Sequence, residues 1–171
     1  LLHAESEANR LRGLELMIEA RDTWLPQRSP SLVPLATVCA ARESARHGDR
    51  QIALDQMRQA VSDLRDAQRI GWIVYCTATL VESLIDGGDD DDLQEAEELV
   101  AHLGGLKQAA IIDVTILRLT ALLAAARGDA AAYRDVVTDY RQRAESFGYQ
   151  GHSEWAASMA DRLELGSTPA S

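Results

Sequence analysis

The segment LIDGGDDDDLQEAEELV, residues 84–100, places four consecutive aspartates directly after two glycines. Two related turns occur elsewhere in the chain, RHGDRQIAL at residues 46–54 and ARGDAAAYR at residues 126–134. Their Gly-Asp pairs lie forty positions apart, at Gly48-Asp49, Gly88-Asp89 and Gly128-Asp129. A fixed period between 20 and 50 residues is typical of repeat architectures. The turns therefore predict a repeat unit of about 40 residues.

The stretches on either side of the turns show what each unit contains. After the first turn, apolar or small residues recur at steps of three and four: Ala53, Met57, Ala60, Val61, Leu64 and Ala67. The third turn is followed by the same pattern: Tyr133, Val136, Val137, Tyr140, Ala144 and Phe147. Such steps define one apolar face of a helix. The stretches before the turns, such as WIVYCTATLVESLI, are apolar on more than one side. We therefore expect a buried helix, a turn and a half-exposed helix, which is a tetratricopeptide-like αα-hairpin.

The glycine and the aspartate of each turn suit the end of one helix and the start of the next. Glycine tolerates the left-handed conformation that ends a helix, and an aspartate carboxylate accepts hydrogen bonds from the free amides that start one. In the middle turn, Asp92 and Glu95 have the spacing of a capping box, so Asp89–Asp91 would be a solvated extension. A calcium loop is the alternative, but it needs alternating rather than contiguous carboxylates. Glycines between the hairpins mark the expected helix exits: Gly71, Gly105 and Gly148.

The whole chain then predicts an all-α, tetratricopeptide-like α-solenoid of antiparallel helix hairpins, with about eight helices. Residues 1–25 form a helix that resembles the second half of an incomplete repeat, and residues 26–31 form a proline-containing linker. Three hairpins occupy residues 32–148. Residues 149–164 form a capping helix, and residues 165–171 form a flexible tail. In the capping helix we expect four residues to point inward: Trp155, Ala156, Met159 and Leu163. Because the chain begins without methionine, we expect it to be part of a longer protein.

Composition and charge exclude several classes of function. The net charge is −10 and Lys107 is the single lysine, so contact with nucleic acid by this segment is not expected. The longest apolar run contains Asp113 and Arg118 and is better explained by a buried helix than by a membrane span. Without a secretory leader, we expect a cytoplasmic protein with two buried free thiols, Cys39 and Cys76. A disulfide between them would need an oxidising compartment.

Motifs for catalysis are missing from the sequence. The histidines lack zinc-ligand spacing, and neither a phosphate-binding loop nor a nucleophile elbow is present. Cys76 paired with a distant histidine is a conceivable nucleophile, but its packed apolar helix disfavours a thiolate. We therefore expect no catalytic residue, no metal site and no cofactor.

A binding hypothesis rests on polar residues within the buried helices. The first helices of stacked hairpins line the concave side of an array. Six polar or amphipathic residues interrupt their apolar faces and form the candidate groove: Arg42, Tyr75, Thr79, Glu82, Asp113 and Arg118. The groove would recognise a peptide or a small effector. The alternative is that neighbouring helices satisfy these side chains, which then have a structural role.

The segment AAYRDVVTDYRQRAESFGYQGHSEWAASM, residues 131–159, resembles the closing repeat of large actinobacterial signalling proteins. The resemblance depends on Tyr133-Arg134, Phe147-Gly148-Tyr149, Gly151-His152, Trp155-Ala156 and Met159. Those proteins join a signal-transduction ATPase to a long tetratricopeptide-like tail. Some also carry an adenylate or guanylate cyclase domain. Others carry a LuxR-type helix-turn-helix and are similar in layout to the maltose regulator.

The resemblance implies a regulatory tail, because the cyclase aspartates, the phosphate loop and the DNA-reading helix are missing from these residues. Our first hypothesis is a non-enzymatic module for protein–protein interaction and regulation within a larger signalling or transcription-regulator protein. It would bind a protein partner or other domains of the parent chain. The second is a sensor that binds a small effector in the groove. A homodimer is compatible with both.

Overall fold

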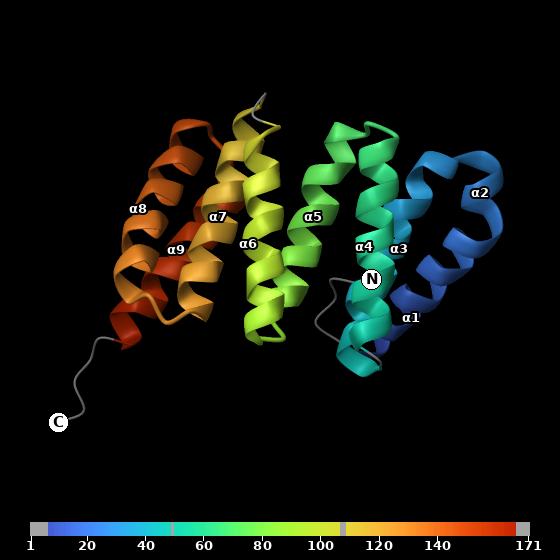
Figure 1. Ribbon diagram of the computed structural model, residues 1–171, viewed down its shortest axis with the longest axis horizontal. Coiled ribbons are helices and arrows are strands. Elements are labelled where there is room, and N and C mark those ends of the chain that lie inside the picture. Colours follow the sequence, from blue (N-terminus) through green and yellow to red (C-terminus); the bar gives the residue numbers. More distant parts are fainter. Residues whose placement is uncertain (1–6, 49, 107–108, 167–171) are drawn as a thin grey trace. The chain divides into compact units, whose positions relative to one another are not determined.

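Helices make up all of the regular structure in the part of the chain that the computed structural model describes, residues 7–48, 50–106 and 109–166 (Figure 1). The expected all-α fold of helical hairpins is therefore confirmed. The described ranges contain nine α-helices instead of about eight, because a short helix, α2, lies where the linker was predicted. The chain divides into two compact units, Leu1–Leu84 and Ile85–Ser171.

The predicted linker at residues 26–31 is wrong in its first half, because the chain stays helical past Pro26. Helix α1 (Glu7–Glu19) runs into a π-helical turn (Ala20–Trp24) and then into α2 (Leu25–Arg28). The amide of Leu25 donates to the carbonyl of Ala20, one residue further back than in an α-helix. A wider turn relieves the clash between a proline ring and the carbonyl four residues earlier. Pro30 begins a 3₁₀ turn, where a missing amide proton has no cost.

The first unit is centred on the hairpin of α3 (Val33–His47) and α4 (Arg50–Asp66), with α1 packed on α3. Helix α5 (Ile70–Ile85) completes the described part of this unit. Its largest fully buried side chains come from α3, α4 and α5: Val38, Leu54, Met57, Leu64, Leu80, Val81 and Leu84. Burial of each large aliphatic side chain stabilises the fold by about 1.5–3 kcal/mol, so these residues make a large contribution to the stability of the unit.

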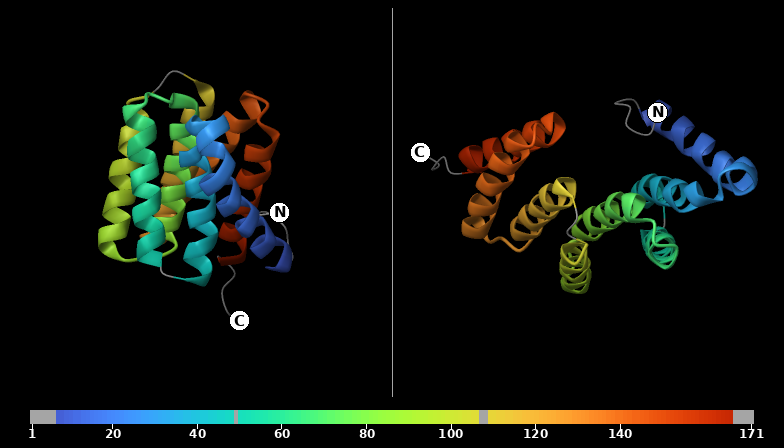
Figure 2. Two further views of the ribbon diagram at one scale, coloured as in Figure 1. Left: turned by 90° about the vertical axis from the view of Figure 1, so that its right-hand side faces the viewer. Right: turned by 90° about the horizontal axis from the view of Figure 1, so that it is seen from above.

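The second unit contains four helices, the last of which closes it. Its elements are α6 (Asp90–Gly104), α7 (Ala110–Ala126), α8 (Ala130–Ser146) and α9 (Gln150–Gly166). Each packs against the next along the chain, and Figure 2 shows α8 beside both α7 and α9. One cluster joins α7, α8 and α9 through Val114, Ala121, Tyr133, Val137, Tyr140, Ala144, Ala156 and Met159. Tyr140 is fully buried and is the largest side chain of this core.

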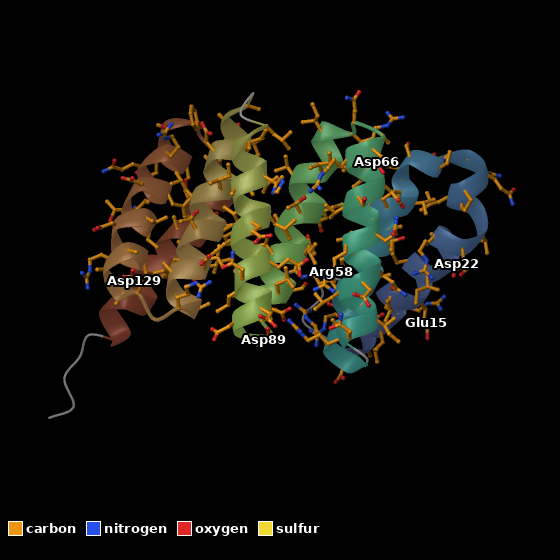
Figure 3. The ribbon with its side chains drawn as sticks, viewed as in Figure 1. Glu15, Asp22, Arg58, Asp66, Asp89 and Asp129 are labelled. Atoms are coloured by element: carbon orange, nitrogen blue, oxygen red, sulfur yellow. The ribbon has the colours of Figure 1, made fainter. Side chains whose placement is uncertain are left out.

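Two of the three Gly-Asp turns have the predicted chemistry. Gly88 and Gly128 have φ values of 73° and 72°, in the left-handed region. The carboxylate of Asp129 accepts a hydrogen bond from the amide of Ala132, at 2.9 Å. Asp89 and Asp129 lie at the N-terminal ends of α6 and α8 (Figure 3). In the first turn, Asp49 lies outside the described residues and Gly48 has a φ of −150°, so it is not left-handed.

The predicted cap of the middle turn is wrong. The N-cap of α6 is Asp89, whose carboxylate accepts from the amide of Asp92 at 2.8 Å. Asp92 is buried in the first turn of the helix and does not start it. The aspartate that follows the left-handed glycine caps the helix, as in the third turn, because the chain leaves that glycine already extended. The two observed caps therefore keep the forty-residue period without an inserted extension.

The helix exits use left-handed residues, but not always the predicted glycines. Gly148 has a φ of 69° and follows α8 as expected. Gly71 instead lies within α5, and Gly105 has a right-handed φ of −72°. The left-handed residue between α4 and α5 is Gln68, with a φ of 52°. The same backbone bonds close the exits at Gln68, Gly128 and Gly148, so three Schellman motifs are present and one of them lacks glycine.

The predicted helix faces are confirmed at their centres and wrong at their ends. Ala53, Met57, Val137 and Tyr140 are buried, whereas Ala67 and Phe147 are exposed in the turns that follow their helices. Trp155 was predicted to point inward but is 53% exposed, because Ala156 and Met159 occupy the buried stripe of α9. The side chain of Leu163 and the tail beyond residue 166 lie outside the described residues.

Candidate functional site

The candidate groove residues fall into two sets. Four belong to the first unit, with Arg42 on α3 and the other three on α5: Tyr75, Thr79 and Glu82. Asp113 and Arg118 belong to the second unit and lie half-buried on α7. Each set is described within its own unit.

Arg42 and Glu82 form an ion pair that links α3 to α5. The Nη2 atom of Arg42 donates to Oε2 of Glu82 at 2.8 Å, and both side chains are half-buried. The two residues are forty positions apart, which is the spacing of the Gly-Asp turns. Equivalent positions of consecutive repeats face each other when the repeats stack, so the period itself was a signal for this pair. The contact fits the structural alternative, because each side chain satisfies the other.

Tyr75 lies one turn before Thr79 on α5 and contacts Cys39 of α3 through its hydroxyl. Its hydroxyl is 3.8 Å from the Sγ atom of Cys39, and its residue is 40% exposed. Burial raises the pKa of Tyr75 to about 12, so its hydroxyl stays protonated at neutral pH. Trp72, one turn earlier, is 41% exposed. The surface of α5 thus presents two large aromatic rings.

The two thiols are free, as expected, but only one of them is fully buried. Cys76 is buried and Cys39 is half-buried. Burial raises the pKa of Cys39 and raises that of Cys76 to about 12. Because the nucleophile is the thiolate, these raised pKa values disfavour the reactive form of both cysteines at neutral pH.

The hydroxyl of Thr79 is turned away from solvent. It donates to the carbonyl of Tyr75 at 3.0 Å, and Ser83 donates in the same way to the carbonyl of Thr79. Both residues are buried. Thr77, on the same helix, is 2% exposed, and its hydroxyl has no hydrogen-bond partner among the described residues. Helix α5 therefore carries a buried hydroxyl that no described residue satisfies.

In the second unit, Arg118 lies against an aromatic cluster at the turn between α8 and α9. Its guanidinium carbon is 4.9 Å from the centre of the Trp155 ring, which is within the range of a cation–π interaction. Four rings follow one another from the turn into α9: Phe147, Tyr149, His152 and Trp155. Successive centroids are 6.0, 6.2 and 5.2 Å apart. We call these four residues the aromatic strip.

Reasoning from sequence missed the aromatic strip as a surface. Phe147 is 43% exposed and Trp155 is 53% exposed, although both were assigned to the packed face. The signal was present in FGYQGHSEW, where four rings occur within nine residues of a chain that is only 5% aromatic. Side chains of this kind are enriched at the centres of protein interfaces. The strip contains both aromatic side chains that are exposed in the described second unit, Phe147 and Trp155.

His152 connects the strip to the core. Its Nδ1 atom is 2.8 Å from the hydroxyl of Tyr140, and the two rings meet edge to face. Burial and the charge of Arg118 both lower the pKa of His152 below its ordinary value of 6.5. The imidazole is therefore neutral at neutral pH.

Among the described residues, no group of three or more histidine, cysteine, aspartate or glutamate side chains is arranged to hold a metal ion. No helix in the described ranges is long and apolar enough to cross a membrane. No family model, curated protein or solved structure shows significant similarity to this chain.

Proposed function

We propose that the chain is a non-enzymatic helical-repeat module for protein–protein interaction and regulation within a larger signalling or transcription-regulator protein. The observation that carries the proposal is the aromatic strip, in which Phe147 and Trp155 are exposed and Trp155 is contacted by the guanidinium group of Arg118. Tryptophan, tyrosine and arginine dominate the binding energy of protein interfaces. The raised pKa values of both thiols also argue against a cysteine nucleophile.

The part that the resemblance implies, a tail that regulates an actinobacterial signalling ATPase, is included in this proposal. The helical hairpins support a regulatory tail through their architecture alone, because stacked hairpins present extended surfaces to partners. The partner is then a protein or another domain of the parent chain.

Site-specific photo-crosslinking in cells tests the proposal. A photoreactive phenylalanine analogue would replace Trp155, Trp72 or, as a control, the exposed Gln142 on α8. We expect a discrete protein adduct at position 155 and only background at position 142. Adducts of equal yield at all three positions, or none above background, would contradict the proposed interaction surface.

The second candidate function is effector sensing, and the unsatisfied hydroxyl of Thr77 favours it. A buried polar group without a partner costs about 1–3 kcal/mol, and a bound ligand or water can supply the missing hydrogen bond. Thermal-shift measurement against a metabolite panel tests this function. The expected result is a stabilising compound whose effect is lost in Thr77→Val, and a panel without such a compound would leave the interaction module as the only proposal.

A further inference from the structure

The hydrogen bond between Tyr140 and His152 has a defined direction. Tyr140 is fully buried, and its hydroxyl proton needs an acceptor. Among the described residues, the only polar partner of this hydroxyl is Nδ1 of His152, at 2.8 Å. The hydroxyl therefore donates and Nδ1 accepts, which places the proton of the neutral imidazole on Nε2.

Protonation of His152 removes this acceptor. Both nitrogens of an imidazolium carry hydrogen atoms, so Nδ1 can then only donate. The buried hydroxyl of Tyr140 can still accept from Nδ1, but its own proton is left without a partner. Leaving a buried donor unsatisfied is one of the larger costs that a single atom can impose on a folded protein.

The charged and titratable groups around His152 increase that cost. Arg118 of α7 acts on the imidazole through its charge, and a second cation would be repelled. Tyr140 of α8 and Tyr149 of the α8–α9 turn present neutral rings. On α9 itself, the neighbouring ring is that of Trp155. Among the described groups that act on the His152 charge, no carboxylate is present to compensate it.

We propose that His152 is a pH-sensitive switch that loosens α9 from α8 on protonation and thereby changes how the aromatic strip is presented. Because His152 is itself a member of the strip and contacts Trp155, a movement of its ring changes the surface against which the exposed tryptophan packs. The use of the switch to control partner binding rests on the proposed interaction function. The switch itself is a property of the closing hairpin.

The direction of the pH dependence follows from the lowered pKa of His152 in the folded chain. An unfolded histidine titrates near 6.5, so between that pH and the folded pKa the unfolded chain binds more protons. The contribution of His152 to stability is therefore fully present above about pH 6.5 and is lost as the pH falls through the folded pKa.

NMR of the imidazole nitrogens in the intact chain tests the structural half of the proposal. Long-range ¹H–¹⁵N spectra distinguish a protonated Nδ1 from a bare one and follow the titration of each histidine. We expect His152 to carry its proton on Nε2 at pH 7.5 and to titrate below 6.5. In Arg118→Gln its pKa should rise, because the neighbouring charge is gone. A proton on Nδ1 at pH 7.5, or a midpoint at or above 6.5, would overturn the switch.

Thermal unfolding at pH 7.5 and 5.0 tests the energetic half, with His152→Gln as the variant that cannot be charged. Between these two values the wild type should lose more Tm than His152→Gln does, because only the wild type can gain a charge at this position. The matched control is His102→Gln, because His102 is an exposed histidine of the same unit. His102→Gln should lose as much Tm between pH 7.5 and 5.0 as the wild type does. Equal losses in wild type and His152→Gln would refute the proposal.

These readouts separate the switch from the proposed function. Both use the protein alone, so the absence of crosslinked partners would remove the interaction surface and leave the titration results unaffected. Conversely, if stability does not depend on the titration of His152 but a discrete adduct forms at position 155, the interaction surface is supported and the switch is refuted.

Discussion

The two units hold their helices together with different chemistry. In the first unit, arginines bridge the helices: Arg42 pairs with Glu82 across α3 and α5, and Arg50 donates to the carbonyls of Ser83 and Leu84 at the end of α5. Glu43, which is buried on α3, binds Arg46 and lies 4.0 Å from Arg10 of α1.

In the second unit, aromatic side chains perform the same task. The hydroxyl of Tyr133 donates to the carbonyl of Met159 at 3.0 Å, and that of Tyr140 donates to His152. The described ion pair between α6 and the end of α7, Arg127 with Glu97, is exposed. The comparison shows that helices of the same hairpin pattern can be linked either by ion pairs or by aromatic side chains, and that the second unit also carries the aromatic strip at its closing end.

The largest expected effect comes from Tyr140→Ala, which removes the biggest buried side chain of the second core. Loss of a buried aromatic ring costs about 3–5 kcal/mol. Hydrogen exchange should show reduced protection in α8 and α9, with α3 and α4 unchanged. Tyr140→Phe is the matched control and should cost about 1 kcal/mol, because only the hydroxyl is lost. Equal loss of protection in both units would show that their cores are not separate.

A smaller effect is expected from the ion pair of the first unit. A double-mutant cycle with Arg42→Met and Glu82→Gln should give a coupling energy of about 1 kcal/mol in denaturant unfolding, since both side chains are half-buried. The coupling should shrink in 1 M NaCl, where charges are screened. A coupling near zero at low salt would mean that the pair does not link α3 to α5 energetically.

Thr77→Val extends the comparison to buried hydroxyls. Those of Tyr133 and Tyr140 in the second unit are satisfied, whereas that of Thr77 has no partner within the described chain. Replacing it with a methyl group of similar size should stabilise the protein by about 1 kcal/mol. Destabilisation would show that the hydroxyl has a partner, such as a bound water.

The smallest effects are expected at the helix exits. The left-handed conformation of Gln68 is strained for a residue with a side chain and unstrained for glycine. Gln68→Gly should therefore stabilise the first unit by about 0.5–1 kcal/mol. Gly128→Ala is the reverse exchange and should cost a similar amount, because a Cβ there meets no atom within 4 Å and only the backbone strain remains. Changes in Tm of opposite sign for the two variants would confirm that the exits share the Schellman motif, and changes of the same sign would contradict it.

The sequence was sufficient for features that depend on local chemistry. The Gly-Asp turns gave the hairpins and their period because a left-handed glycine and a capping aspartate act within a few residues. The pairing of Arg42 with Glu82 could have been predicted from the sequence, because their spacing equals that period.

Other features could not be predicted because they depend on competition between neighbours. Four adjacent aspartates could each cap α6, and only the backbone after Gly88 selects Asp89. Trp155 is more hydrophobic than Ala156, yet the smaller side chain is the one buried in α9, where it joins the cluster around Tyr140. Side-chain volume in the assembled core decides this, and periodicity alone does not.

The most direct test of the contrast between the units is hydrogen exchange of the whole chain under two perturbations, with intrinsic rates corrected for pH. Lowering the pH from 7.5 to 5.0 should reduce protection in α8 and α9 while leaving α3 and α4 unchanged. Raising NaCl to 1 M should reduce protection in α3 and α5 and leave α8 and α9 unchanged. If both perturbations affect both units alike, the division into a charge-linked and a ring-linked unit is wrong.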